Sequence, residues 1–148
     1  MNQKKAELFK SWPNFSQEEA NKAKDILLSN KVNYWTGEEC RKFEEEFAEY
    51  VQCKYAVATS NGTTALDLAF KAMNLDPGSE VLVTSRTFLA SVSSVINAGL
   101  VPKFIDVSRD TQNIDVSKLE NVITSKTKAI LCVHLAGWPC DMDEIMCI

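Results

Sequence analysis

Apolar residues in the first part of the chain recur at the three- and four-residue spacing of an amphipathic helix. The sequence Ser16-Gln17-Glu18-Glu19 has the form of a capping box, in which a hydroxyl and a carboxylate each satisfy a free backbone N–H, and it predicts a helix over 17–29. A second such sequence, Thr36-Gly37-Glu38-Glu39, predicts a helix through Phe43, Phe47 and Tyr50. Because the stretch 30–35 is polar and aromatic without a period, we expect a linker between the two helices.

From residue 55 onward, short β-branched runs alternate with helical segments, which is the pattern of a parallel sheet with crossover helices. The runs predict strands over 55–59, 80–84, 102–107 and 128–135. The intervening patterns predict a helix over 63–73 with Leu66, Leu68, Ala69 and Phe70 inward, a turn at 76–78, a helix over 89–98 ended by Gly99, and a helix from Asp115 through Leu119, Val122 and Ile123. Since the strands are apolar on both sides, we expect an α/β fold with three αβα layers and a mainly parallel sheet.

The chain therefore divides into an N-terminal helical segment, 1–54, and a sheet-containing segment, 55–148. In the second segment Asp141 predicts the start of one more helix, which reaches Ile148 after about two turns without a glycine, a basic last turn or a polar cap. A helix this short is marginal alone, and Ile145 and Ile148 would be exposed without a partner. We accordingly expect the sheet domain to be truncated.

Composition fits a globular domain. The 148 residues are 45% hydrophobic and 24% charged, which excludes a disordered, collagen-like or disulfide-stapled chain. With 16 Lys and Arg against 20 Asp and Glu, the net charge of −4 gives no general attraction to nucleic acid or anionic membranes, so any anion site must be local. The acidic run Glu44-Glu45-Glu46 is flanked by Phe43 and Phe47 and is interpreted as a solvated helix face.

The number and spacing of the cysteine and histidine residues do not indicate a metal site. There are five cysteines without a C-x-x-C pair and a single histidine, so we expect no zinc site and reduced, mostly buried thiols. The first seven residues are charged and lack the apolar core of a signal peptide, and no run approaches the roughly 20 apolar residues of a membrane span. These features predict a cytoplasmic protein without a membrane partner.

A candidate anion site lies in Thr59-Ser60-Asn61-Gly62-Thr63-Thr64-Ala65, where a predicted strand ends and a helix begins. Free N–H groups at a helix N-terminus, the helix dipole and two hydroxyls suit a phosphate, and ligands of open α/β sheets bind at the carboxyl ends of strands. The sequence matches neither a P-loop nor a dinucleotide fingerprint, so a small phosphorylated ligand is favoured. Helix capping alone would also explain these residues.

Two further side chains follow predicted strands and so belong to the same edge of the sheet. Phe88, in Thr84-Ser85-Arg86-Thr87-Phe88, could lie flat on a heteroaromatic ring whose phosphate sits at 62–64; alternatively it is the first core residue of its helix. His134 could act as a base or a ring contact, or it could be structural. Asp106 and Asp110 are interpreted as solvated turn residues.

The order of these segments resembles the DegT/StrS family of pyridoxal-phosphate-dependent sugar aminotransferases. The resemblance runs from about residue 12 to the end of the chain and is carried by several separated blocks. These blocks are Tyr34-Trp35-Thr36-Gly37, Phe43 to Tyr50, Tyr55 to Leu66, Thr87 to Ala90, Gly99 to Val107, and Thr127 to Asp143. Trp138 and Ser85 depart from the commoner family pattern, which leaves details of the cofactor or substrate contact at Trp138 open.

The resemblance implies the large domain of a fold-type-I pyridoxal-phosphate transferase, with its active site at a homodimer interface. It implies that Gly62, Thr63 and Thr64 hold the phosphate of pyridoxal 5'-phosphate and that Phe88 stacks on its pyridine ring. The family moves an amino group, usually from glutamate, to a keto group of a nucleotide-linked sugar for amino-sugar or surface-polysaccharide synthesis. The lysine and aspartate that serve the cofactor come after the block matching Asp141 to Ile148, so no catalytic residue is assigned and the chain alone is expected to be inactive.

Two other functions stay open at this point. Related sugar dehydratases of the same fold use pyridoxamine phosphate and carry histidine in place of the lysine, at a position beyond this sequence. Alternatively, the chain is a non-catalytic module that binds a phosphorylated ligand or a partner subunit.

Overall fold

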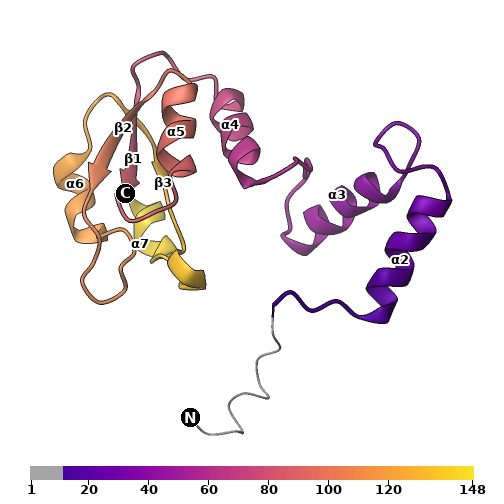
Figure 1. Cartoon of the computed structure of the whole chain (residues 1–148). Coiled ribbons are helices and arrows are strands. Elements are labelled where there is room, and N and C mark those ends of the chain that lie inside the picture. The colour runs from indigo at the N-terminus through magenta and orange to yellow at the C-terminus, as the bar shows by residue number, and fades with distance from the viewer. Residues whose placement is uncertain (1–11) are drawn as a thin grey trace, which may run out of the picture. The chain divides into compact units, whose positions relative to one another are not determined.

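A computed structural model describes residues 12–148, which form two units (Figure 1). The first unit reaches Ala58 and the second spans Thr59–Ile148. The expectation about the first seven residues lies outside the described residues. Within the described range, none of the helices is both long enough and apolar enough to cross a bilayer.

The first unit contains helices α2 (Gln17–Leu28) and α3 (Glu39–Tyr50), as the apolar spacing predicts. The capping box of α2 is confirmed, because Glu19 N–H donates to the Ser16 hydroxyl at 3.2 Å and Ser16 N–H donates to the Glu19 carboxylate at 2.6 Å. Among its described residues only Ala48 is buried. The aromatic residues of α3 pack on one another instead, with the Phe43 and Phe47 ring centroids 5.7 Å apart.

The second predicted capping box is wrong. Helix α3 follows Glu38, which makes no side-chain capping bond, and Thr36 lies in the preceding turn. The Asn33 side-chain oxygen accepts from the backbone N–H groups of Trp35 and Thr36, each at 3.0 Å, and from the Thr36 hydroxyl at 3.1 Å. A local asparagine turn thus competes successfully for the hydroxyl that would cap the helix.

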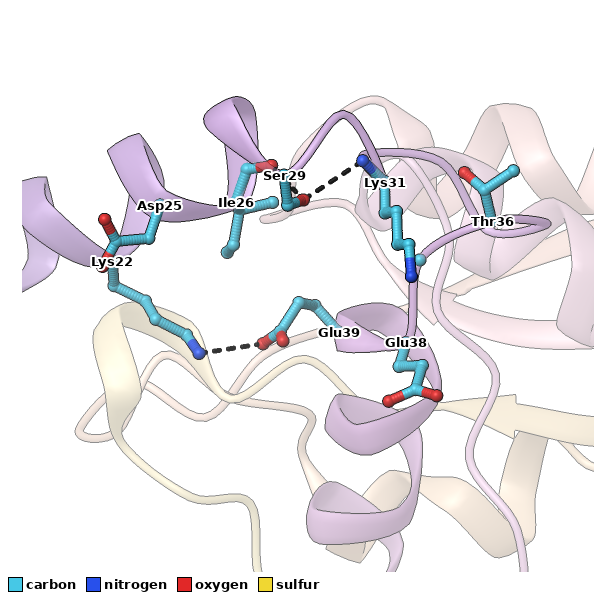
Figure 2. Close-up of a pocket in the computed structure, with 9 residues that line it drawn as sticks. Lys22, Asp25, Ile26, Ser29, Lys31, Thr36, Glu38 and Glu39 are labelled. Carbon is cyan, nitrogen blue, oxygen red and sulfur yellow. Dashed lines mark hydrogen bonds and ion pairs between the residues drawn. The ribbon is translucent and has the colours of Figure 1, made fainter.

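Gly37 is required where this turn closes on itself. A Cβ at this position would stand 2.3 Å from the backbone oxygen of Lys31, so only glycine allows the close approach. The turn and the two helices enclose a hollow of about 340 Å³ (Figure 2). Lys22 pairs with Glu39 at 3.5 Å, and the other charged residues that line the hollow are Asp25, Lys31 and Glu38. Acidic groups therefore outnumber basic ones, and the hollow offers no preference for an anion.

The second unit follows the predicted alternation of strands and helices. Its three strands form one parallel sheet in the order β2-β1-β3, with β1 in the centre. The helices and strands are α4 (Gly62–Ala72), β1 (Glu80–Thr84), α5 (Ala90–Asn97), β2 (Val101–Ile105), the 3-10 turn η1 (Val116–Lys118), α6 (Leu119–Val122), β3 (Thr127–Leu131), the 3-10 turn η2 (Leu135–Gly137) and α7 (Met142–Cys147). The predicted turn at 76–78 and the end of α5 before Gly99, which has φ +78°, are confirmed.

Three of the four predicted strands differ from the structure. The strand expected over 102–107 is β2, which ends at Ile105. The segment 55–59 forms no strand and lies outside the three-stranded sheet; Ala58 N–H donates at 2.8 Å to the Glu44 carboxylate and not to a neighbouring strand. The Glu44 carboxylate therefore holds the backbone of segment 55–59 by a hydrogen bond, in addition to belonging to the acidic helix face. Strand β3 ends at Leu131, short of the expected residue 135, because Leu135 N–H bonds to the Asn113 side chain at 3.1 Å.

The sheet is covered on both faces, which confirms the three αβα layers. One face of β1 presents Val81 to a cluster with Phe70 of α4, Val95 of α5 and Leu100. The other presents Leu82 to a cluster with α6 and α7, whose members are Ile105, Ile114, Leu119, Cys140 and Ile145. Figure 1 shows α4 and α5 together on one side of the strands and α6 on the other.

Several burial predictions need correction. On α4, Phe70 is buried and Leu66 is half-buried, but Leu68 and Ala69 are exposed because the helix packs along a narrower stripe. Ile145 is 7% exposed and packs in the core, contrary to the expectation that it lacks a partner, whereas Ile148 is 48% exposed. The cysteines are all free, as expected, but only Cys140 is buried; Cys53 and Cys147 are exposed.

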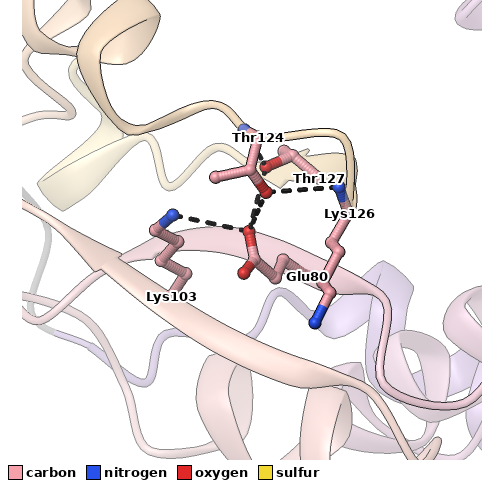
Figure 3. A network of polar contacts seen from close by, with 5 residues as sticks. All are labelled: Glu80, Lys103, Thr124, Lys126 and Thr127. Atoms are coloured by element: carbon pink, nitrogen blue, oxygen red, sulfur yellow. Dashed lines mark hydrogen bonds and ion pairs between the residues drawn. The ribbon is translucent and has the colours of Figure 1, made fainter.

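A polar network joins the amino-terminal part of all three strands (Figure 3). The Glu80 carboxylate on β1 accepts from the Thr124 hydroxyl at 2.6 Å, the Thr127 hydroxyl at 3.3 Å and the Lys103 ammonium at 3.4 Å. These partners, the Thr124 bond above all, lower the pKa of Glu80 from its usual value. The network lies opposite the carboxyl edge where ligands of such sheets bind.

We expect Glu80→Gln to weaken the acid dependence of unfolding. Because the pKa of Glu80 is lower in the folded state, its contribution is fully present above the unfolded value and is lost as the pH falls through the folded value. The urea midpoint of the unchanged protein should therefore decline more steeply at acid pH than that of the variant. Glu120→Gln, at an exposed position on α6, is the matched control and should leave the slope unchanged; equal slopes for both variants would contradict the network's role.

Candidate functional site

A capping box between Asn61 and Thr64 shapes the N-terminus of α4, so the helix capping that the sequence allowed does occur here. Asn61 Oδ1 accepts from Thr64 N–H at 3.0 Å, and Asn61 N–H donates to the Thr64 hydroxyl at 3.3 Å. The Thr64 hydroxyl also donates to the Asn61 carbonyl oxygen at 2.9 Å. Both polar groups of Thr64 are thus engaged in holding the turn. The signal was present in the sequence as an Asn three residues before a Thr.

Gly62 and Thr63 keep their backbone donors available. Over residues 12–148, no hydrogen bond uses the N–H of either residue. Gly62 is exposed, and a Cβ at this position would meet no atom within 4 Å, so the residue has open space around it. Two free donors at the positive end of an eleven-residue helix match the chemistry of a phosphate group. A cofactor phosphate therefore fits here, on Gly62 and Thr63 more directly than on Thr64.

The connections place this helix start at the carboxyl edge of the sheet. A short stretch, 73–79, leads from the end of α4 to the amino end of β1, so α4 runs back along the sheet from the opposite edge. Helix α5 begins just after the carboxyl end of β1 and packs against α4. The starts of both helices thus belong to the edge at which parallel sheets bind ligands.

Phe88 lies at the start of α5 and is 75% exposed. The alternative interpretation of Phe88 as the first core residue of its helix is wrong, since Ala90 is the first buried position. The neighbouring Thr87 and Ser91 hydroxyls bond to each other at 2.7 Å and fix the turn that carries the ring. An exposed aromatic face at the same edge as a helix start with free N–H groups suits a flat heteroaromatic ligand that carries a phosphate.

Side chains join the loops that follow the three strands. The Arg86 guanidinium, after β1, donates to the Gln112 side-chain oxygen in the loop after β2. The adjacent Asn113, 4% exposed, donates through its amide nitrogen to the carbonyl oxygens of Trp138 and Pro139, both at 2.9 Å. Together with the bond from Leu135 N–H, these contacts make Asn113 the support of the loop after β3. No pattern near Asn113 in the sequence indicated this role.

His134 is oriented by the same loop. Cys140 N–H donates to His134 Nδ1 at 3.0 Å, so Nδ1 is an acceptor, and the neutral imidazole carries its proton on Nε2. The ring is exposed, as is Trp138 at 63%. Asp106 is an exposed turn residue that also holds the Lys118 ammonium at 2.9 Å, and this contact raises the pKa of Lys118.

The comparisons with known proteins agree on one family. The model of the DegT/DnrJ/EryC1/StrS aminotransferase family matches residues 13–148. The GDP-perosamine synthase of Escherichia coli O157:H7 is 45% identical over 119 residues, which are 80% of this chain and 31% of that protein. That of Caulobacter vibrioides is 50% identical over 105 residues, 71% of this chain and 28% of that protein.

Solved structures show the same likeness. The aminotransferase from Psychrobacter cryohalolentis has a TM-score of 0.89 and 57% identity, covering 94% of this chain and 35% of that one. The GDP-4-keto-6-deoxy-D-mannose-3-dehydratase of E. coli has a TM-score of 0.83 and 31% identity, covering 91% of this chain and 36% of that one. The chain spans about a third of the length of these relatives.

Proposed function

The chain belongs to the DegT/DnrJ/EryC1/StrS aminotransferase family, and we propose that it forms the cofactor-holding part of a pyridoxal-phosphate-dependent aminotransferase that converts a nucleotide-linked keto sugar to an amino sugar. The observation that carries the proposal is the start of α4, where Gly62 and Thr63 have free N–H groups at the same edge of the sheet as the exposed Phe88 ring. The names of the similar GDP-perosamine synthases support a nucleotide sugar as substrate. The amino donor would be glutamate.

In this proposal each group of the site has a separate task. The N–H groups of Gly62 and Thr63 and the Thr63 hydroxyl donate to phosphate oxygens, while Asn61 and Thr64 hold the turn in shape. The Phe88 ring covers one face of the pyridine and excludes water from it. When bound, the cofactor supplies an electron sink for carbanion chemistry.

The aminotransferase is favoured over the dehydratase because of the higher similarity. Identity to the Psychrobacter aminotransferase is 57%, against 31% to the dehydratase of E. coli. A homodimer and a cytoplasmic location are implied by the family resemblance and stay predictions. The division of the chain at residues 54 and 55 into a helical segment and the first part of a cofactor-binding domain is likewise a proposal.

The activity is tested with the protein as its gene encodes it. We expect the purified gene product with pyridoxal 5'-phosphate to convert glutamate to 2-oxoglutarate only when a nucleotide-linked keto sugar is added, with one amino sugar formed per glutamate consumed. Mass spectrometry of the sugar and an enzymatic 2-oxoglutarate assay measure the two products. A sugar product that has lost a hydroxyl and gained no amino group would identify a dehydratase and overturn the proposal.

The ring contact is tested by Phe88→Ala. Pyridoxine 5'-phosphate is the suitable probe, because it has the ring and phosphate but no aldehyde that could react with surface lysines. Losing an aromatic stacking partner worth about 0.5–1.5 kcal/mol should weaken binding roughly 2- to 13-fold in a calorimetric titration of the chain. Leu89→Ala, at a neighbouring residue with the same 75% exposure, is the matched control. Equal affinities for the unchanged chain and the Phe88 variant would count against the stacking role.

A further inference from the structure

Two cysteines flank the loop that follows β3, and the proposed function uses neither. Cys140 is 5% exposed and belongs to the core cluster around Leu82, while Cys132 is half-buried and packs against the same cluster. Both are free thiols. Between them lies the loop with His134 and Trp138, which Asn113 supports from the other side.

The backbone already brings the two positions together. The Cys140 thiol donates to the carbonyl oxygen of Val133, the residue next to Cys132, at 3.3 Å, and Cys140 N–H bonds to His134 at 3.0 Å. Both side chains also pack in the core cluster around Leu82. Burial raises the pKa of Cys132, and the neighbouring Cys140 thiol raises it further through its charge and a side-chain hydrogen bond. The Cys140 thiol thus already reaches the residue that follows Cys132, so the fold holds the two cysteines of this short loop near each other.

We propose that Cys132 and Cys140 are a redox site that a hydroperoxide oxidises to an intramolecular disulfide, which closes the loop carrying His134 and Trp138. This inference rests on the contacts of the second unit and does not depend on the proposed aminotransferase activity. Cys132 is assigned the first attack because it is the more accessible of the pair, and its raised pKa means that mildly alkaline conditions favour the reacting thiolate.

The reaction balances as follows for hydrogen peroxide. The Cys132 thiolate attacks one peroxide oxygen, the O–O bond breaks, and the products are a sulfenic acid and, after protonation, one water. The Cys140 sulfur then attacks the sulfenic sulfur, the S–O bond breaks, and the hydroxide leaves as a second water with the Cys140 proton. The two thiols lose two electrons and two protons in total, and the peroxide is reduced to two waters. A dithiol reductant reverses the bond by thiol–disulfide exchange.

The sequence allows a sharp test by mass spectrometry. The full chain is treated with hydrogen peroxide at mildly alkaline pH, remaining thiols are alkylated with N-ethylmaleimide, and the protein is cut after Lys128 and before Asp141. The resulting peptide 129–140 contains Cys132 and Cys140 and no other cysteine. We expect this peptide to carry no alkyl group and to be lighter than the reduced peptide by two hydrogen atoms. Reduction before alkylation should restore two alkyl groups.

Variants separate this pair from the other thiols. Cys132→Ser and Cys140→Ser should each abolish the lighter peptide, while Cys53→Ser, at an exposed position, should leave it unchanged. If removal of the buried Cys140 thiol prevents folding, the Cys132→Ser variant still tests the proposal, because Cys132 is only half-buried. A peptide 129–140 that still carries two alkyl groups after Cys53 has been oxidised would overturn the proposal. A bond from either cysteine to Cys147 would also overturn it.

Discussion

Asn113→Ala is expected to lower the free energy of unfolding of the sheet unit by roughly 2–4 kcal/mol, although no sequence motif marks this residue. The change removes three hydrogen bonds, to the oxygens of Trp138 and Pro139 and from Leu135 N–H, at a position that is 4% exposed. The loss of one partner from a buried polar contact costs more than the bond contributes, because the remaining groups lose water as well. Urea unfolding followed by far-ultraviolet circular dichroism measures the difference.

Asn97→Ala is the matched control for this prediction. Asn97 is the last residue of α5, is exposed, and has no side-chain hydrogen bond within residues 12–148. Its variant should unfold within about 0.5 kcal/mol of the unchanged chain. An Asn113 variant that is no less stable than the Asn97 variant would show that the loop after β3 does not depend on the amide.

The second large effect is expected for Leu82→Ala in the central strand. Leu82 is fully buried and packs with Ile105, Leu119 and Ile145, so its truncation leaves a cavity among side chains from β2, α6 and α7. Truncation of a buried leucine to alanine lowers the free energy of unfolding by about 2–5 kcal/mol, and the loss is largest where the surrounding side chains cannot move in to fill the cavity. In a small domain this is a large share of the total stability. The same denaturation experiment measures it.

Leu68→Ala provides the comparison for the core position. Leu68 lies on α4 with 47% of its surface exposed, and its truncation should cost less than half as much. Similar losses for Leu82 and Leu68 would mean that the sheet core is not packed as described.

The contrast between β1 and segment 55–59 shows what local sequence can establish. Both are short apolar runs, and β1 was predicted with the bounds that the structure has. Segment 55–59 has the same local character but no strand beside it in the described chain, and a strand is defined by the partner that accepts its hydrogen bonds. Partners far along the chain cannot be read from a window of a few residues.

In the candidate site, too, the sequence identifies residues whose role depends on their neighbours along the chain and misses those whose partners are distant. Gly62, Thr63 and Phe88 were identifiable because glycine, hydroxyl and aromatic residues at strand ends have a local meaning. Asn61 was identifiable in the same way, through its capping box with Thr64. Asn113 was not, because its bonding partners lie between 22 and 26 residues away and are backbone atoms, which leave no trace in the sequence.

The central claim is that the start of α4 and the ring of Phe88 hold a phosphorylated pyridine. The most direct measurement is a nitrogen–proton correlation spectrum of the labelled chain during titration with pyridoxine 5'-phosphate, with unphosphorylated pyridoxine as the comparison. We expect the amide signals of Gly62 and Thr63 to shift only with the phosphorylated probe, because their free N–H groups would donate to the phosphate. Unchanged signals at these two residues, with shifts elsewhere in the chain, would contradict the claim.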